Sequence, residues 1–293
     1  MAYPDATHLP FNSTLIQDVF RPGPPDHDNP HIPGFWLVMQ NDHLVLAEGQ
    51  SGFSLPFGAA PAPGPWLLPP VSIGTWEGRP LRVGRLAPEV AIPQPYCPVP
   101  TDYRTSRLDD RLLTLSGLAR QILHWRDRSQ ICPSCGGLPR TIPGSWGVCC
   151  PQCSREYYPR IHPAVIVLIT RGDEFLLVRK PEWPVGFYGL VAGFVEFGES
   201  LEECAVREIK EETGLAVTDL RYLCSQSWPF PSQLMAGFSA RYVGGDIQVD
   251  NDELEEAAWF RADRLPPALP SRISIARHIL ENYAPGFGKT LVR

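Results

Sequence analysis

The sequence has no long uninterrupted apolar run and no excess of positive charge. Its longest stretch without a charged residue, 49–76, contains six prolines between Pro56 and Pro70, and a helix cannot keep its hydrogen bonds through so many prolines. A membrane-spanning helix is therefore not expected. With 26 basic and 32 acidic residues, the formal charge is −6. This charge argues against binding nucleic acid by bulk attraction but leaves a local basic groove open.

A secretory signal and a disulfide framework are also missing. The N-terminus has no basic segment followed by an apolar core, so a cytoplasmic location is expected. Five of the eight cysteines fall within the 22 residues 132–153, a clustering more typical of metal binding than of disulfides in a reducing compartment. Hydrophobic residues make up 43% of the chain, which excludes a wholly disordered protein.

Proline sets the first hundred residues apart, since 19 of the 33 prolines lie there. Apolar runs at 34–39 and 43–47 predict a β-hairpin, and 81–86 predicts another strand. The segment 52–70 is expected to be a stiff loop. Apolar residues then recur at helical spacing over 109–128, which predicts an amphipathic helix.

The C-terminal half has the pattern of a mixed α+β domain, with no internal repeat in the sequence. Strands are expected at 164–169, 175–178, 188–192, 216–223 and 234–242, and helices at 199–213 and from about Ser271. Gly214 is the expected end of the first of these helices. The predicted domains are 1–128, β-rich and ending in the linking helix, 129–160, rich in cysteine, and 161–286.

Two Cys-x-x-Cys pairs lie 14 residues apart, Cys132 with Cys135 and Cys150 with Cys153. Four thiolates can close a tetrahedron around one Zn²⁺ and leave no open position, so a structural zinc ribbon is expected. Cys149 is an alternative ligand, but only Cys150 keeps the two-residue spacing. Zinc ribbons often bind nucleic acid. The linker 136–148 carries one formal charge, which favours a brace for the fold.

Three carboxylates crowd one face of the helix predicted over 199–213. At about 100° per residue, Glu208, Glu211 and Glu212 fall within one sector of about 100°, which apolar residues occupy in the earlier turns. Like charges at these spacings repel, and burying them unpaired would cost far more. Oxygen ligands at this density suit Mg²⁺ or Mn²⁺. A divalent cation site is therefore expected rather than a solvated acidic face.

The residues around this helix match a longer pattern. The string from Gly193 to Leu215 fits G-x₅-E-x₇-R-E-U-x-E-E-x-G-U at every fixed position, where U is a bulky aliphatic residue. This string is identified as the signature of the Nudix hydrolases, which hydrolyse a nucleoside diphosphate linked to another moiety. The resemblance implies an α+β fold, an α/β/α sandwich with a mixed sheet, preceded here by the zinc ribbon and the β-rich N-terminal domain.

The resemblance also implies roles for individual residues. The three crowded glutamates would bind the metals, with the backbone carbonyl of Ala192 as a further ligand. Arg207 would orient the glutamates, and Glu199 would brace the loop–helix geometry. Glu256 resembles the distal glutamate that completes the metal set, with Glu255 as its rival. The general base stays open between Glu211, Glu212 and a loop residue outside the signature.

A second motif follows the signature. The segment Ser225-Gln-Ser-Trp-Pro-Phe-Pro-Ser-Gln-Leu-Met235 resembles the SQPWPFPxS motif of the NADH pyrophosphatases, the Nudix branch that also removes NAD caps from RNA. A zinc ribbon directly before the Nudix domain is a further point of resemblance to this family. The resemblance as a whole covers about residues 109–280. Within the motif at 225–235, it implies that the following residues bind substrate: Gln226, Ser227, Trp228, Pro229, Phe230, Pro231, Ser232 and Gln233.

The motif departs from the family pattern at two places. Ser227 stands where the family usually has proline, and Ser232-Gln233 replaces a variable residue followed by serine. A lost proline loosens the loop slightly. These departures bear on the strength of NAD(H) selectivity more than on the pyrophosphatase reaction.

Three further residues are implied by resemblance. Tyr158 and Phe194 resemble the aromatics that hold the nicotinamide ring between them, an arrangement for which flat rings are suited. Core packing is the alternative for Tyr158. Ala276 would line the site through its backbone.

The expected function is hydrolysis of NADH or NAD⁺ to nicotinamide mononucleotide and AMP, with Mg²⁺ or Mn²⁺ as catalytic and Zn²⁺ as structural metal. NAD-capped RNA is an expected second substrate, and the resemblance implies a homodimer. Six arginines on or near the linking helix could form an RNA track, although a solvated helix face is favoured: Arg104, Arg107, Arg111, Arg120, Arg126 and Arg128. The alternatives are a pyrophosphatase of another dinucleotide or ADP-ribose and, remotely, a sensor without turnover.

Overall fold

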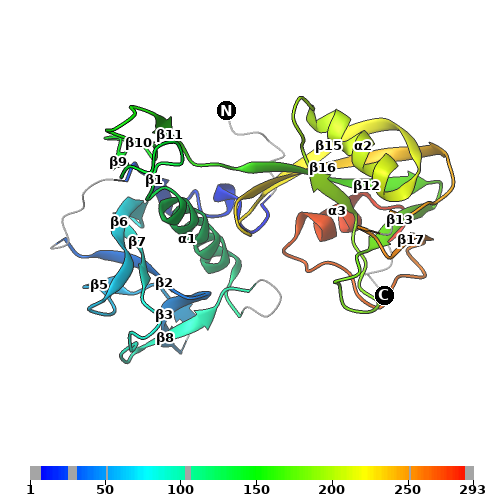
Figure 1. Cartoon of the computed structure of the whole chain (residues 1–293). Coiled ribbons are helices and arrows are strands. Elements are labelled where there is room, and N and C mark those ends of the chain that lie inside the picture. Colours follow the sequence, from blue (N-terminus) through cyan, green and yellow to red (C-terminus); the bar gives the residue numbers. More distant parts are fainter. Residues whose placement is uncertain (1–7, 26–31, 51, 103–106, 251, 288–293) are drawn as a thin grey trace. The chain divides into compact units, whose positions relative to one another are not determined.

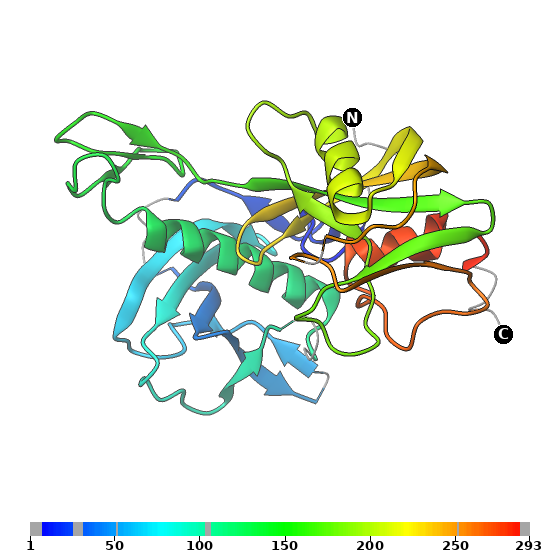
Figure 2. The ribbon, with the colours of Figure 1, turned by 45° about the vertical axis from the view of Figure 1, so that its right-hand side comes forward.

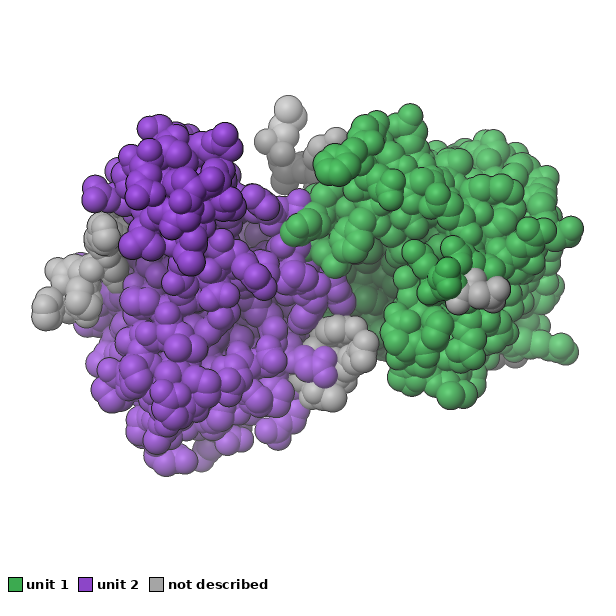
Figure 3. Space-filling model, in the orientation of Figure 1, with its two compact units in different colours: residues 1–9, 162–227, 233–293 green, residues 10–161, 228–232 purple. Residues whose placement is uncertain are grey.

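The computed structural model of the chain describes residues 8–25, 32–50, 52–102, 107–250 and 252–287 (Figure 1). Its contacts divide the chain into two units (Figure 3): unit 1 comprises residues 1–9, 162–227 and 233–293, and unit 2 comprises residues 10–161 and 228–232. Among the described residues, no helix is both long and apolar enough to cross a membrane.

Unit 1 is built on a mixed six-stranded sheet with the order β15-β16-β12-β13-β17 and with β14 paired to β12. Strand β12 is parallel to β16 and antiparallel to β13 and β14. The strands are β12 (His162–Arg171), β13 (Glu174–Arg179), β14 (Val191–Phe194), β15 (Ala216–Trp228), β16 (Gln233–Gly244) and β17 (Glu256–Phe260).

Helices α2 (Leu201–Thr213) and α3 (Ile275–Tyr283) cover the two faces of this sheet (Figure 2). Successive side chains of a strand point to opposite faces. Val165, Val167 and Ile169 of β12 accordingly share a core with α2, whereas Ile166 and Leu168 share a core with α3. The arrangement is an α/β/α sandwich, which confirms the predicted fold class.

Unit 2 contains an eight-stranded sheet with the order β1-β6-β7-β2-β3-β4, with β5 paired to β2 and β8 to β3. Helix α1 (Asp110–Arg128) packs against β7 and β2. The strands are β1 (Phe20–Pro22), β2 (Gly34–Gln40), β3 (His43–Gly49), β4 (Gly52–Ser54), β5 (Phe57–Gly58), β6 (Trp66–Trp76), β7 (Arg79–Leu86) and β8 (Tyr96–Pro100), and a 3₁₀ turn, η1, spans Ser13–Leu15. A three-stranded ribbon follows α1: β9 (Arg140–Thr141), β10 (Val148–Cys149) and β11 (Glu156–Tyr157).

The two large sheets repeat one topology. The order β6-β7-β2-β3-β8 in unit 2 matches β15-β16-β12-β13-β17 in unit 1, and β5 pairs with β2 as β14 pairs with β12. In each sheet the central pair is parallel and the next helix packs on it, α1 in one case and α3 in the other. The expectation of no internal repeat is therefore wrong at the level of the fold.

The repeat differs where unit 1 has α2. Between β5 and β6 the chain has no helix, and the connecting residues 59–65 include Pro61, Pro63 and Pro65. Prolines at this density remove helix hydrogen bonds. Unit 2 is thus the same fold without the helix that carries the acidic motif.

Most predicted elements are confirmed. The hairpin is β2–β3, and α1 begins after Asp109, whose carboxylate accepts the N–H of Leu112 at 2.8 Å. The prediction of a stiff loop over 52–70 is wrong, since β4, β5 and the start of β6 lie in this segment. Strand β6 passes through Pro69 and Pro70 at a shift in register against β7, because proline cannot donate a ladder hydrogen bond and the pairing resumes after it.

Candidate active site

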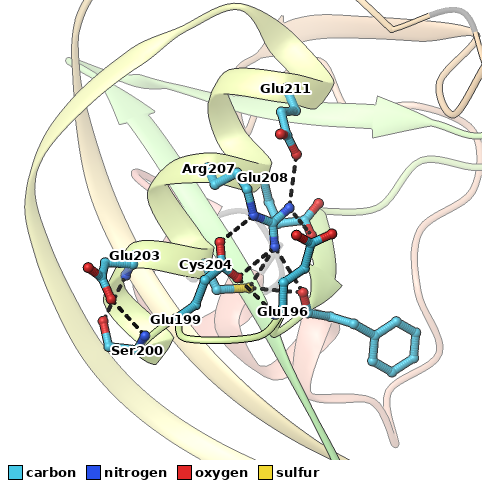
Figure 4. A network of polar contacts seen from close by, with 9 residues as sticks. Glu196, Glu199, Ser200, Glu203, Cys204, Arg207, Glu208 and Glu211 are labelled. Carbon is cyan, nitrogen blue, oxygen red and sulfur yellow. Dashed lines mark hydrogen bonds and ion pairs between the residues drawn. The ribbon is translucent and has the colours of Figure 1, made fainter.

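The loop from Gly193 to Glu199 leads from β14 into α2 and is closed by side-chain contacts (Figure 4). Glu199 accepts the backbone N–H of Glu196 at 2.9 Å. Ser200 caps the helix in a reciprocal pair with Glu203, which satisfies two backbone donors at once. At the other end Gly214 has φ +74°, the left-handed conformation that ends helices. These local signals fix the helix where the sequence places it.

Arg207 is the centre of a network that joins the helix to the loop (Figure 4). Its Nη2 donates to Glu199 at 2.9 Å and to the carbonyl of Phe194 at 3.0 Å. Its Nη1 donates to Glu208 and to Glu211, each at 2.9 Å. The hydrogen bonds from Arg207 and from the Glu196 amide lower the pKa of Glu199 to about 2. Arg207 therefore orients two glutamates of the motif and ties Glu199 to the helix.

Glu208, Glu212 and Glu253 each place a carboxylate oxygen within 4.8 Å of the others. Glu208 and Glu212 are 7% and 1% exposed. Within the described part of the chain, neither carboxylate oxygen of Glu212 has a hydrogen-bond partner, and Lys180 Nζ lies 3.8 Å from Glu212 Oε1. Burial raises the pKa of Glu212 to about 8, against the opposing effect of Lys180. Burial also raises the pKa of Glu208, against the hydrogen bond from Arg207.

Two buried carboxylates facing one another are unfavourable unless a cation lies between them. The orphaned oxygens of Glu212 and the donor set of three carboxylates fit a hard divalent cation. The Glu208 carboxyl group also fits only because residue 193 is glycine, since a Cβ at Gly193 would lie 1.9 Å from Glu208 Cδ. The trio is therefore a candidate metal centre.

The other glutamates predicted as metal ligands lie outside the trio and bind other side chains. Glu211 is exposed and bound to Arg207 rather than part of the trio. Glu256 accepts a hydrogen bond from the Tyr188 hydroxyl at 2.6 Å, and Glu255 forms an ion pair with Arg179. Glu253, which sequence reasoning missed, is the glutamate of that segment that reaches Glu208 and Glu212. Ala192 lies in β14, next to Gly193.

The four cysteines of the Cys-x-x-Cys pairs form a second cluster, in unit 2, with all Sγ atoms within 4.8 Å of one another. Cys132 Sγ lies 3.7 Å from Cys153 Sγ, and Cys135 Sγ lies 3.5 Å from Cys150 Sγ. A tetrahedron with Zn–S bonds of ~2.3 Å has sulfur–sulfur edges of ~3.8 Å. The cluster therefore fits a structural zinc ion. Cys149 lies outside it, in β10.

Comparisons with known proteins agree with this geometry. The NUDIX domain family matches residues 160–283, and the NADH pyrophosphatase-like rudimentary NUDIX domain matches residues 33–125. The chain is 43% identical over 218 residues to the NAD-capped RNA hydrolase NudC of Pseudomonas aeruginosa, covering 74% of this chain and 77% of that protein. The chain belongs to the NADH pyrophosphatase family of Nudix hydrolases.

Further relatives are similar over most of their length. The NAD-capped RNA hydrolase NudC of Stutzerimonas stutzeri is 38% identical, covering 87% of this chain and 91% of that protein. Among solved structures, a Nudix hydrolase from Nitrosomonas europaea is 26% identical with a TM-score of 0.45, covering 53% of this chain and 92% of that one. Unit 1 holds the matched Nudix domain with its acidic helix, and unit 2 holds the rudimentary one.

The predicted substrate residues of this Nudix hydrolase fall in both units. Tyr158 is in unit 2, and its hydroxyl donates to Glu156 at 2.6 Å. Phe194 is in unit 1, at the end of β14, and both aromatic rings are about half exposed. Ala276 is buried in α3 in the core that backs the sheet.

The second motif divides between the units as well. Gln226 is fully buried in unit 1, where its amide accepts the N–H of Ile275 and donates to the carbonyl of Ile273, each at 2.7 Å. Gln226 thus fixes the start of α3. Ser227 in β15 and Gln233 in β16 belong to unit 1, whereas residues 228–232 belong to unit 2.

The arginines of the linking helix mostly contact unit 2 itself. Arg111 pairs with Asp18 at 2.6 Å and Arg120 with Asp42 at 3.0 Å. Arg126 donates to the carbonyl of Pro69 at 2.6 Å, and the guanidinium of Arg107 lies over the ring of Phe53. Arg128 is exposed, and Arg104 lies outside the described residues. Most of the described arginines therefore have intramolecular partners.

Proposed function

We propose that the protein hydrolyses the pyrophosphate bond of NADH and NAD⁺, giving AMP and reduced nicotinamide mononucleotide from NADH, and AMP and nicotinamide mononucleotide from NAD⁺. NAD-capped RNA is the proposed second substrate, with 5′-monophosphate RNA as its product. The observation that carries the proposal is the presence in one chain of the carboxylate trio and the motif at residues 225–235. Relatives 38–43% identical, named NAD-capped RNA hydrolases, support it.

In this proposal Glu208, Glu212 and Glu253 hold Mg²⁺ or Mn²⁺, with Glu211 and the carbonyl of Ala192 as further candidate ligands. Bound divalent cations would neutralise the pyrophosphate oxygens and lower the pKa of a bound water. Arg207 keeps Glu208 and Glu211 oriented through its two 2.9 Å hydrogen bonds. A glutamate of the site accepts the proton of the attacking water.

The cysteine cluster holds Zn²⁺ as a brace for the ribbon at residues 129–160, between the N-terminal domain, 1–128, and the catalytic domain, 161–286. Tyr158, Phe194, Ala276 and the motif residues bind substrate. The protein acts in the cytoplasm as a homodimer.

Hydrolysis of NADH, NAD-capped RNA and ADP-ribose, measured side by side with Mg²⁺ and Mn²⁺, tests the substrate assignment. The expected result is release of reduced nicotinamide mononucleotide from NADH at a higher kcat/KM than hydrolysis of ADP-ribose. Preference for ADP-ribose would instead assign the site to an ADP-ribose pyrophosphatase. Glu212→Gln should remove activity and Glu202→Gln, at an exposed position of the same helix, should keep it. Unchanged turnover in Glu212→Gln would contradict the proposal.

A further inference from the structure

The five residues Trp228–Ser232, here called the motif loop, belong to unit 2, although Trp228 is the last residue of β15, β16 begins at Gln233, and the other residues of both strands lie in unit 1. Their surroundings in unit 2 are aromatic. The ring centroid of Phe11 lies 5.7 Å from both Trp228 and Phe230, nearly perpendicular to each, and Trp228 and Phe230 lie 5.2 Å apart. Edge-to-face contacts at these distances are favourable. The loop is therefore held by a three-ring cluster.

Phe11 is itself fixed in an unusual conformation. Its φ is +70°, a left-handed backbone that bulky residues rarely adopt. Its backbone N–H donates to Thr114 Oγ1 of α1 at 2.9 Å, and its side chain is 6% exposed. An unfavourable backbone conformation persists where the surrounding structure imposes it. Here the imposed conformation places the Phe11 ring against the motif loop.

Helix α1 approaches the loop at a glycine. A Cβ at Gly117 would lie 2.5 Å from Phe11 and 2.9 Å from Pro229. Glycine is the least favourable residue of a helix interior apart from proline, and α1 is otherwise regular around it. The absence of a side chain at position 117 is therefore what lets the helix, Phe11 and the loop meet.

One turn further along α1, Arg120 also contacts the loop. Its guanidinium lies 5.4 Å from the centroid of Phe230, and Asp42 at 3.0 Å and Thr101 Oγ1 at 2.7 Å fix its orientation. Thr114, Gly117 and Arg120 are spaced by three and so form one ridge of the helix. A cavity of ≈ 250 Å³ adjoins Arg120, Phe230 and Pro231, so the loop has room to shift if these contacts are lost.

We propose that this cradle, formed by Phe11 and the α1 residues Thr114, Gly117 and Arg120, positions the motif loop for NAD(H) and so sets substrate selectivity. The rudimentary domain then has a task in the reaction, and Phe11, Gly117 and Arg120 are positioning residues. The inference rests on the proposed function, because the loop's role in NAD(H) selectivity comes with it. Arg120 is in this view occupied by the loop and by Asp42 rather than offered to RNA.

The decisive variant is Gly117→Ala. Alanine has a higher helix propensity than glycine, but its Cβ would occupy the space where α1 meets Phe11 and Pro229. Phe11→Leu removes the aromatic contacts with the loop, and Arg120→Gln removes the cation–π contact with Phe230. Phe11→Tyr keeps an aromatic ring at position 11. Arg111→Gln is the matched control, because it breaks an ion pair of the same helix, with Asp18, outside the cradle. Two kinds of measurement are made on the full-length chain: hydrogen exchange of the peptide spanning residues 226–234, and steady-state kinetics that give kcat and KM for NADH and for ADP-ribose.

Gly117→Ala, Phe11→Leu and Arg120→Gln should raise exchange in the 226–234 peptide and leave exchange in α2 unchanged. The ratio of kcat/KM for NADH to kcat/KM for ADP-ribose should fall on the order of tenfold, mainly through a higher KM for NADH. A small displacement of a substrate-positioning group, even one far from the reacting atoms, can lower catalytic efficiency by this factor or more. Phe11→Tyr and Arg111→Gln should keep the wild-type ratio.

Unchanged exchange in Gly117→Ala, or raised exchange with an unchanged substrate ratio, would overturn the proposal. A wild-type enzyme that does not hydrolyse NADH would defeat the proposed function instead, and the exchange measurement would still report whether the cradle holds the loop.

Discussion

The carboxyl group of Glu208 occupies the space that a side chain at Gly193 would fill, with only 1.9 Å between Glu208 Cδ and the position of such a Cβ. Gly193 lies in β14 and Glu208 in α2, so the strand and the helix can place a carboxylate between them only if the strand residue has no side chain. This contact ties the first glycine of the Nudix signature to the candidate metal centre.

Gly193→Ala should therefore remove activity while the domain still folds. The alanine displaces Glu208 from the trio, and a misplacement of this size costs about 100-fold in rate. The measurement is kcat for NADH together with thermal unfolding, with Gly244→Ala as the control, since a Cβ there meets no atom within 4 Å. Activity within twofold of wild type in Gly193→Ala would contradict the assigned role of Glu208.

A second prediction concerns pH and the metal-free protein. Burial raises the pKa of Glu212 to about 8, whereas in the unfolded chain it is about 4.3. Between these values the folded state binds the additional proton, so the free energy of unfolding should fall as pH rises through this window. Glu212→Gln should reduce this slope, and so should saturating Mg²⁺ or Mn²⁺. Chemical unfolding at pH 5, 6, 7 and 8 measures the slope, and equal slopes in the wild-type protein and in Glu212→Gln would contradict the raised pKa of the buried Glu212 carboxyl group.

The third prediction concerns Arg207. Arg207→Lys keeps the charge but loses the planar fork that reaches Glu199, Glu208 and Glu211 together. The loss should be on the order of 10- to 100-fold in kcat or in apparent metal affinity, which is typical for residues that orient metal ligands. Titration of NADH hydrolysis with Mn²⁺ separates the two effects. Wild-type values for both would show that the network does not orient the ligands.

Zinc removal is the fourth prediction. Cys150→Ser should lower the zinc content measured by atomic spectroscopy, since its Sγ is one corner of the cluster, whereas Cys149→Ser should keep one zinc per chain. Loss of the ion should destabilise the ribbon, because metal binding in such sites contributes to folding. Equal zinc content in the two variants would contradict the assignment of Cys150.

The sequence predicts α2 and the cysteine cluster correctly because both depend on local spacing. The capping residue Ser200, the glycine after Thr213 and the doubled Cys-x-x-Cys are visible within short windows. Three glutamates in the segment 252–256 offer no such signal. The distinction depends on the pairing of β17 with β13, where Arg179 binds Glu255 and Tyr188 binds Glu256. Glu253 is then the glutamate that faces α2.

The internal repeat escapes sequence reasoning for a related reason. A Nudix domain is recognised by its helix and the loop before it, and unit 2 has neither, since prolines replace the helix between β5 and β6. What persists is strand order and pairing, which depend on long-range contacts rather than on a local pattern. The cradle around the motif loop is likewise a set of contacts between residues a hundred positions apart.

Anomalous diffraction from manganese in crystals grown with Mn²⁺ and substrate tests the central claim most directly. We predict an anomalous peak bounded by the carboxylates of Glu208, Glu212 and Glu253, and its loss in Glu253→Gln but not in Glu256→Gln. Absence of a peak beside Glu208 and Glu212, or a peak that depends on Glu256 instead of Glu253, would contradict the assignment of this trio as the metal centre.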